Sequence, residues 1–110
     1  STLADCAIQM REAKVGALLV KEGESYGGVV SEGDLVRKAM ASCLDQTQER
    51  VRRVMNTPVV TIEIHRSAHE ASDLMAEHGI RHIAVTDEGQ IVGMISVRHL
   101  LRYFKNWGGV

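Results

Sequence analysis

The stretch GGVVSEGDL at residues 27–35 returns later in the chain as VGMISVRHL at residues 92–100. The two stretches share a glycine, two apolar residues, a serine and a closing leucine in the same order. Three residues after the serine, however, the first stretch has Asp34 and the second has His99. A phrase that returns in this way indicates an internal repeat, and the repeat guides the interpretation of the rest of the chain.

An offset of 65 residues aligns residues 2–37 with residues 67–102 without a gap. Both copies begin with the pattern of a capping box, TLAD (2–5) and SAHE (67–70), and continue with apolar residues at helical spacing. The offset also brings seven identical pairs together: Met10 and Met75, Glu12 and Glu77, Val20 and Val85, Gly28 and Gly93, Ser31 and Ser96, Leu35 and Leu100, and Arg37 and Arg102.

Each copy then contains two short apolar runs joined by a glycine-containing turn, which predicts a β-hairpin. The turns are KEGES (21–25) and TDEGQ (86–90), and a further helix is expected to begin near the serine that follows each hairpin. The β-branched run TPVVTIEI (57–64) predicts one more strand before the second copy. The corresponding strand before the first copy is absent from this chain.

These elements predict an α+β fold made of two pseudo-symmetric β-α-β-β-α repeats that pack sheet against sheet. Residues 1–40 form the first repeat without its leader strand, 41–54 form a partly helical linker, and 55–105 form the second repeat. One copy alone is too small to bury both its helices and its sheet, so the two copies together make one module.

The chain resembles a tandem pair of cystathionine-β-synthase (CBS) domains, called a Bateman module. GIRHIAVTDEGQIVGMISVRHLL (79–101) and VMNTPVVTI (54–62) carry the resemblance, together with the repeated glycine, serine and acid spacing. The chain departs from the family at Leu19 and Ala84, where the family often has proline, and at His99. The resemblance implies a regulatory, non-catalytic homodimer that needs no cofactor. It also implies binding of an adenosine-containing nucleotide such as AMP, ADP or ATP between the repeats.

Ser31 and Asp34 are the first candidates for ligand contact, because they stand at the start of a helix. The helix dipole and the free backbone N–H groups there favour a phosphate, which a carboxylate would repel. We therefore expect Asp34 to accept hydrogen bonds from a ribose diol and Ser31 to contact a phosphate or ribose oxygen. Both residue types are also ordinary helix caps, and this alternative stays open.

The resemblance implies that the strand before the second copy forms the other wall of the site. Val59 and Thr61 are then expected to flank the adenine, although both could simply alternate along a half-buried strand. The resemblance assigns phosphate contact to Arg81 and His82, with a solvated surface arginine as the alternative. In the first copy the matching residues, Gly16 and Ala17, carry no charge.

Ser96 and His99 would form a second site, which we expect to be degraded or differently tuned. A neutral imidazole does not offer the paired acceptors of a carboxylate. A protonated His99 could instead donate to a phosphate. We therefore predict that the copies share a fold but not a ligand chemistry.

Composition excludes several other classes of protein. The net charge of −1 argues against nucleic-acid binding, and the basic stretch RVRR (50–53) is expected to be a solvated helix face near Asp45 and Glu49. No apolar run approaches the length of a membrane span. Cys6 and Cys43 stand among apolar residues, so we expect both to be buried, reduced thiols in the cytoplasm.

Metal binding and catalysis find little support in the sequence. The five histidines at positions 65, 69, 78, 82 and 99 lie in the second half of the chain without an evident partner set, so no metal site is expected. No P-loop and no nucleophile with a supporting base can be recognised.

The alternative function is a ligand-free dimerisation module. LLRYFKNW (100–107) contains large apolar and aromatic residues beyond Leu100, namely Leu101, Tyr103, Phe104 and Trp107. On so small a domain some of them are expected to be exposed unless a partner covers them, or else they cap their own core.

Overall fold

A computed structural model describes residues 1–101 of the chain. The chain divides into two compact units, the first spanning Ser1–Val59 and the second beginning at Val60. Within residues 1–101 no helix has both the length and the apolar character needed to cross a bilayer.

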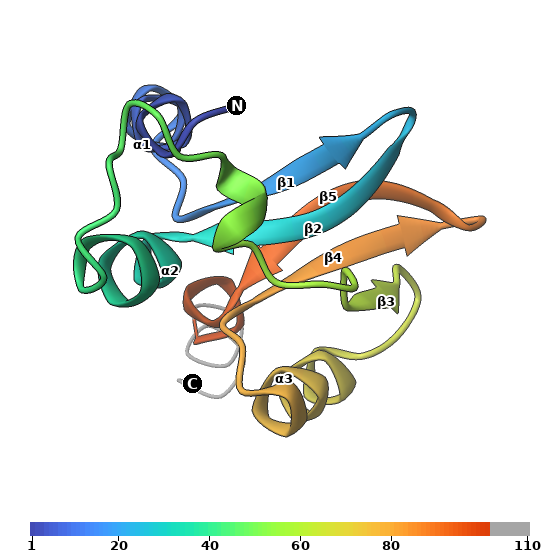
Figure 1. Cartoon of the computed structure of the whole chain (residues 1–110). Coiled ribbons are helices and arrows are strands. Elements are labelled where there is room, and N and C mark those ends of the chain that lie inside the picture. Colours follow the sequence, from blue (N-terminus) through green and yellow to red (C-terminus); the bar gives the residue numbers. More distant parts are fainter. Residues whose placement is uncertain (102–110) are drawn as a thin grey trace. The chain divides into compact units, whose positions relative to one another are not determined.

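The first unit is a β-hairpin with helices before and after it (Figure 1). β1 and β2 pair antiparallel, with Ala17 opposite Ser31. The capping box predicted for α1 is confirmed, because the Thr2 hydroxyl accepts from Asp5 N while the Asp5 carboxylate accepts from Thr2 N. In chain order the elements are α1 (Leu3–Ala13), β1 (Ala17–Glu22), β2 (Ser25–Ser31), the single turn α2 (Glu32–Asp34), the π-helix η1 (Leu35–Met40) and the 3₁₀ turn η2 (Val51–Arg53).

The core of the first unit lies between α1, the hairpin and the segment after η1. α1 buries Leu3, Cys6 and Met10 on one face, whereas Ala7, one of the apolar residues at helical spacing, is exposed. The apolar stripe of α1 is therefore narrower than the sequence indicated. The other buried members of this core are Val30, Ala39, Val51 and Val54.

The second unit is a mixed three-stranded sheet with one helix between its first two strands (Figure 1). β3 pairs parallel with β4, and β4 pairs antiparallel with β5. The elements are β3 (Thr61–Glu63), α3 (Ala68–His78), β4 (His82–Asp87) and β5 (Gln90–Ser96), followed by helical residues 97–101. Its buried core consists of Ile62, Ala71, Met75, Ile83 and Leu100.

The repeat found in the sequence is reproduced in the hairpins of the two units. His82 lies opposite Ser96 in the second hairpin, as Ala17 lies opposite Ser31 in the first. Both hairpins have a register shift immediately after the equivalent valines, Val20 and Val85. The prediction of an α+β fold with repeated elements is confirmed.

We predicted a strand over residues 57–64. The prediction is wrong for residues 57–60, because only Thr61–Glu63 form β3. Asn56 instead pairs with β2, where Asn56 N donates to Val29 O at 2.8 Å and Val29 N donates to Asn56 O at 3.0 Å. Pro58 has no N–H with which to continue a ladder. The backbone of Asn56, which precedes β3, thus pairs with a strand of the first unit.

The second capping box is only half formed. Ser67 Oγ accepts from Glu70 N at 3.1 Å, but the Glu70 carboxylate lies 3.5 Å from the Ser67 hydroxyl instead of accepting from the Ser67 backbone. The other Glu70 oxygen lies 3.5 Å from Arg66.

The expectation that both thiols are buried is confirmed for Cys6 and wrong for Cys43. Cys43 follows η1 in a turn, where its φ is +56°. The apolar neighbours from which its burial was inferred therefore do not enclose it, because the residue stands in an exposed turn.

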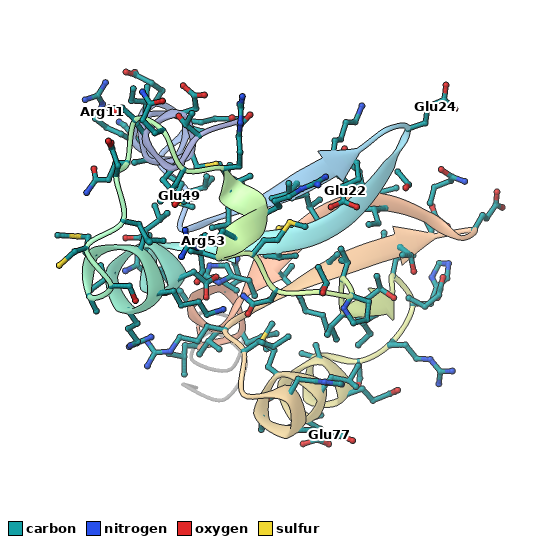
Figure 2. All side chains as sticks on the ribbon, viewed as in Figure 1. Arg11, Glu22, Glu24, Glu49, Arg53 and Glu77 are labelled. Carbon is teal, nitrogen blue, oxygen red and sulfur yellow. The ribbon has the colours of Figure 1, made fainter. Side chains whose placement is uncertain are left out.

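The linker is partly helical, as predicted, and its basic stretch is solvated. Arg52 lies 3.7 Å from Glu22, and Arg53 pairs with Glu49 (Figure 2). The arginine side chains are 72% and 59% exposed, so these pairs are surface pairs of small energetic value.

Of the C-terminal apolar residues, Leu101 is exposed, and Tyr103, Phe104 and Trp107 lie outside the described residues.

Candidate functional site

The candidate site in the first unit is centred on the carboxylate of Asp34, whose side chain is only 10% exposed. Its Oδ2 atom accepts from Ser31 N at 2.8 Å, from Ser31 Oγ at 2.9 Å and from Asn56 Nδ2 at 2.8 Å. Its Oδ1 atom lies 3.1 Å from Lys38 Nζ. We call Ser31, Asp34, Lys38 and Asn56 the Asp34 network.

Local sequence explains two members of this network besides Asp34 itself. Ser31 is the N-cap of α2 and forms a reciprocal capping box with Asp34, whose N–H donates to Ser31 Oγ at 3.2 Å. Lys38 follows Asp34 by four residues, the spacing at which helical side chains meet. The helix start therefore presents a carboxylate with a cation beside it.

Asn56 reaches the network because its backbone pairs with Val29 of β2. Lys38 Nζ then joins the two segments, since it donates to Asn56 Oδ1 at 2.7 Å and to Val54 O at 3.2 Å. The Asp34 carboxylate thus acts as a helix cap and as the anchor of the segment after η2. The alternative that Ser31 and Asp34 cap a helix is confirmed, and it does not exclude a ligand role.

Sequence reasoning missed both Lys38 and Asn56. The spacing of four residues could have identified Lys38 as a partner of Asp34. Asn56 stands 22 residues from Asp34, and no local pattern connects them. Only the pairing of residue 56 with β2 brings its amide to the carboxylate.

The equivalent cap in the second unit is built from Ser96 and His99. Ser96 N donates to His99 Nδ1 at 3.0 Å, and His99 N donates to Ser96 Oγ at 3.3 Å. The imidazole nitrogen thus takes the place of the carboxylate oxygen. Because Nδ1 accepts from a backbone N–H, this geometry corresponds to the neutral ring with its proton on Nε2. The exchange of Asp for His keeps the cap and removes the charge.

Arg81 and His82 belong to the same end of the second hairpin as this cap. His82 lies opposite Ser96, and Arg81 O accepts from Val97 N at 2.9 Å. Arg81 is exposed and His82 is half-buried. Four of the predicted ligand residues, Arg81, His82, Ser96 and His99, are therefore brought together within the second unit.

Val59 and Thr61 stand on the two sides of the boundary between the units. Val59 is half-buried at the end of the first unit, and Thr61 is exposed at the start of β3, opposite Ala84. Their assignment to an adenine ring stays a prediction.

A family model described as CBS domain matches residues 51–106. Uncharacterized protein MK0525 of Methanopyrus kandleri is 30% identical over 103 residues, which are 92% of this chain and 53% of that protein. This chain thus spans about half the length of that relative.

Two solved structures give the same result for the fold. A protein with CBS domains from Burkholderia ambifaria superposes with a TM-score of 0.89 at 34% identity, over 94% of this chain and 76% of that one. The hexameric CBS-CP12 protein from bloom-forming cyanobacteria superposes with a TM-score of 0.85 at 30% identity, over 93% of this chain and 61% of that one.

Proposed function

Because the chain belongs to the CBS domain family, we propose that it is a regulatory module that binds an adenosine-containing nucleotide of the AMP, ADP or ATP type. The observation that carries the proposal is the Asp34 carboxylate, held in place at a helix start by Ser31. Asp34 accepts from the ribose, and Ser31 contacts a phosphate or ribose oxygen. The module has no catalytic role and works in the reducing cytoplasm, where its two cysteines stay free.

The two oxygens of Asp34 differ in the capacity they have left for a ribose. Oδ1 has only Lys38 as a partner among the described residues, so one lone pair is available to a hydroxyl. Oδ2 already receives three donors, of which Ser31 supplies two from the cap itself. A second ribose hydroxyl therefore takes the place of Asn56 Nδ2.

The first unit contains a cation, Lys38, although its residues Gly16 and Ala17, which match Arg81 and His82, carry no charge. Lys38 Nζ lies beside the carboxylate, and its side chain is 45% exposed. In this proposal Lys38 offsets part of the repulsion between Asp34 and a nucleotide phosphate. The roles of Val59 and Thr61 toward the base, and of Arg81 and His82 toward phosphate, stay predictions.

The proposed second site differs because Ser96 and His99 present no carboxylate. We assign it no ribose contact.

The affinity of the Asp34 site can be estimated from its contacts. An adenine ring that loses ~150 Å² of apolar surface contributes about 4 kcal/mol, and hydrogen bonds to charged groups add about 1.5–3 kcal/mol each. After the cost of association, the expected dissociation constant at the Asp34 site is of micromolar order.

A thermal-shift series on the full chain tests the proposal. We expect AMP at millimolar concentration to raise the Tm and 2′-deoxy-AMP, which lacks one ribose hydroxyl, to raise it less. ATP, NAD and S-adenosylmethionine in the same series identify the preferred ligand. His99→Ala changes the cap that has no carboxylate, and it should leave the difference between the AMP and 2′-deoxy-AMP shifts unchanged. The absence of any shift, or equal shifts with AMP and the 2′-deoxy analogue, would remove the ribose assignment.

A second candidate function is assembly, most simply as a homodimer. Val36 and Leu101 occupy equivalent positions of the two repeats, and both are large apolar residues that are more than half exposed, at 55% and 63%. Met40, one turn after Val36, is 58% exposed. Light scattering on the native chain and on Val36→Glu, with and without AMP, tests this function. A monomer under every condition would exclude it.

A further inference from the structure

Three side chains able to ligate a metal meet at one end of the pair β3 and β4. The two strands run parallel, with Glu63 opposite Thr86, so their carboxyl ends lie side by side (Figure 1). Glu63 is the last residue of β3 and Asp87 is the last residue of β4. Parallel pairing therefore brings two carboxylates from distant parts of the sequence to one edge.

A tight turn after β3 adds His65 to this edge. Ile64 N donates to Thr86 O at 2.7 Å, and Arg66 N donates to Glu63 O at 3.0 Å, so the turn is held against β4 and closed on itself. His65 N donates to Glu63 Oε2 at 3.2 Å, while His65 Nε2 lies 3.9 Å from Glu63 Oε1. The backbone thus orients one glutamate oxygen and leaves the other directed toward the imidazole.

The ligand atoms of the three groups lie close enough together for a small movement to bring them onto one ion. One ligand atom from each of Glu63, His65 and Asp87 lies within 4.8 Å of the others. Ligands of a zinc ion lie about 2.0–2.2 Å from the metal, and hence roughly 3–3.5 Å from one another. A contraction of about 1.5 Å is within reach of exposed side chains that rotate about their own bonds.

The charge at this edge is also suitable for a cation. Within residues 1–101, Asp87 makes no ion pair, and the His65 ring is the only basic group paired with Glu63. The nearest arginine in sequence, Arg66, pairs with Glu70 at 3.5 Å. Two carboxylates therefore face each other with only an imidazole to offset their charge.

We propose that Glu63, His65 and Asp87 form a binding site for a divalent transition-metal ion, with Zn²⁺ as the best match. One imidazole nitrogen and two carboxylate oxygens suit zinc, whereas calcium and magnesium prefer oxygen ligands alone. Water fills the remaining coordination positions, since the His65 side chain is 84% exposed. An exposed site of three ligands binds weakly, and we expect a dissociation constant of about micromolar order.

Calorimetric titration of the EDTA-treated full chain with ZnCl₂ tests the proposal. We expect one site per chain, with affinity reduced at least ~10-fold by His65→Ala, which removes a ligand, and by Asp87→Asn, which replaces a charged oxygen ligand with a neutral one. His78→Ala and Glu77→Gln are the matched controls, since they change a histidine and a carboxylate at exposed positions of α3 and should leave the affinity unchanged. Glu77 is labelled in Figure 2. The titration is repeated in Cys43→Ser, because an exposed thiol also binds zinc.

A paramagnetic ion locates the site independently of affinity. On addition of Co²⁺, we expect amide signals of residues 63–66 and 86–88 to shift or broaden first. No zinc binding, binding that His65→Ala leaves intact, or Co²⁺ effects centred on Cys43 or His78 would each overturn the proposal. None of these measurements uses a nucleotide, so the result is independent of the proposed ligand site.

Discussion

The two helix caps allow a matched test of how much a buried carboxylate stabilises this fold. Asp34 and His99 occupy equivalent positions and form the same cap hydrogen bonds with Ser31 and Ser96. They differ in burial, because Asp34 is 7% exposed and His99 is exposed. They also differ in reach, because Asp34 additionally holds Asn56 and Lys38. Alanine at either position therefore removes the helix cap. Alanine at position 34 also removes the contacts with Asn56 and Lys38.

The expected loss of stability follows from the individual interactions. The cap is worth about 1 kcal/mol in either unit. The hydrogen bond from Asn56 to a charged oxygen adds about 1.5–3 kcal/mol. The ion pair with Lys38, whose side chain is 45% exposed, is screened by solvent and adds no more than about 1 kcal/mol. We expect Asp34→Ala to lower the free energy of unfolding by about 2.5–5 kcal/mol and His99→Ala by about 1 kcal/mol.

Urea unfolding of the ligand-free protein, followed by far-UV circular dichroism at pH 7, measures both losses. Hydrogen exchange should localise the effect of Asp34→Ala to β2, α2 and residues 54–56. If the two alanine variants are destabilised equally, the Asp34 network contributes nothing beyond its cap and our reasoning is wrong. A large loss also means that Asp34→Ala alone cannot identify a ribose contact, which is why the nucleotide test varies the ligand.

Three further outcomes are expected. Burial raises the pKa of the Cys6 thiol, whereas Cys43 is exposed, so Cys43 should react with a thiol reagent much faster than Cys6 in the native state. Cys43→Ser should abolish the fast phase, and two phases of equal rate would contradict this expectation. Hydrogen bonds from the Thr2 backbone and hydroxyl lower the pKa of Asp5 below 3.8, so its stabilising effect is present at neutral pH and is lost as the pH falls through that lowered value. The difference in unfolding free energy between wild type and Asp5→Asn should therefore shrink below about pH 3.8, and a constant difference would refute the cap's role. Gly28→Ala should cost about 1–3 kcal/mol, because a Cβ there would lie 2.9 Å from Asn56 O, whereas its repeat equivalent Gly93 has nothing within 4 Å and should tolerate alanine in the same urea assay.

The candidate site was partly predictable, and the missing parts have one physical cause. Ser31 and Asp34 could be identified because a capping box is written into four consecutive residues. Asn56, and the meeting of Glu63 and His65 with Asp87, could not be identified in this way. Each of these contacts depends on which strand a distant segment pairs with, and the residues between the partners carry no local signal of that choice.

The strand before the second repeat was likewise only partly predictable from the sequence. The β-branched run at 57–64 predicts extended backbone, but it does not say which partner the backbone will pair with. Asn56 pairs with β2, Pro58 interrupts the ladder, and β4 receives only Thr61–Glu63 as a strand. Cys43 is a similar case, because its exposure follows from one residue with positive φ.

The sequence by itself determined the two repeats, their hairpins and helices, and the serine that caps each second helix. These features rest on periodicity and capping, which act between residues a few positions apart. Tertiary structure alone decided that Asn56 reaches Asp34 and that Glu63 and His65 meet Asp87, because both contacts depend on strand pairing across more than twenty residues.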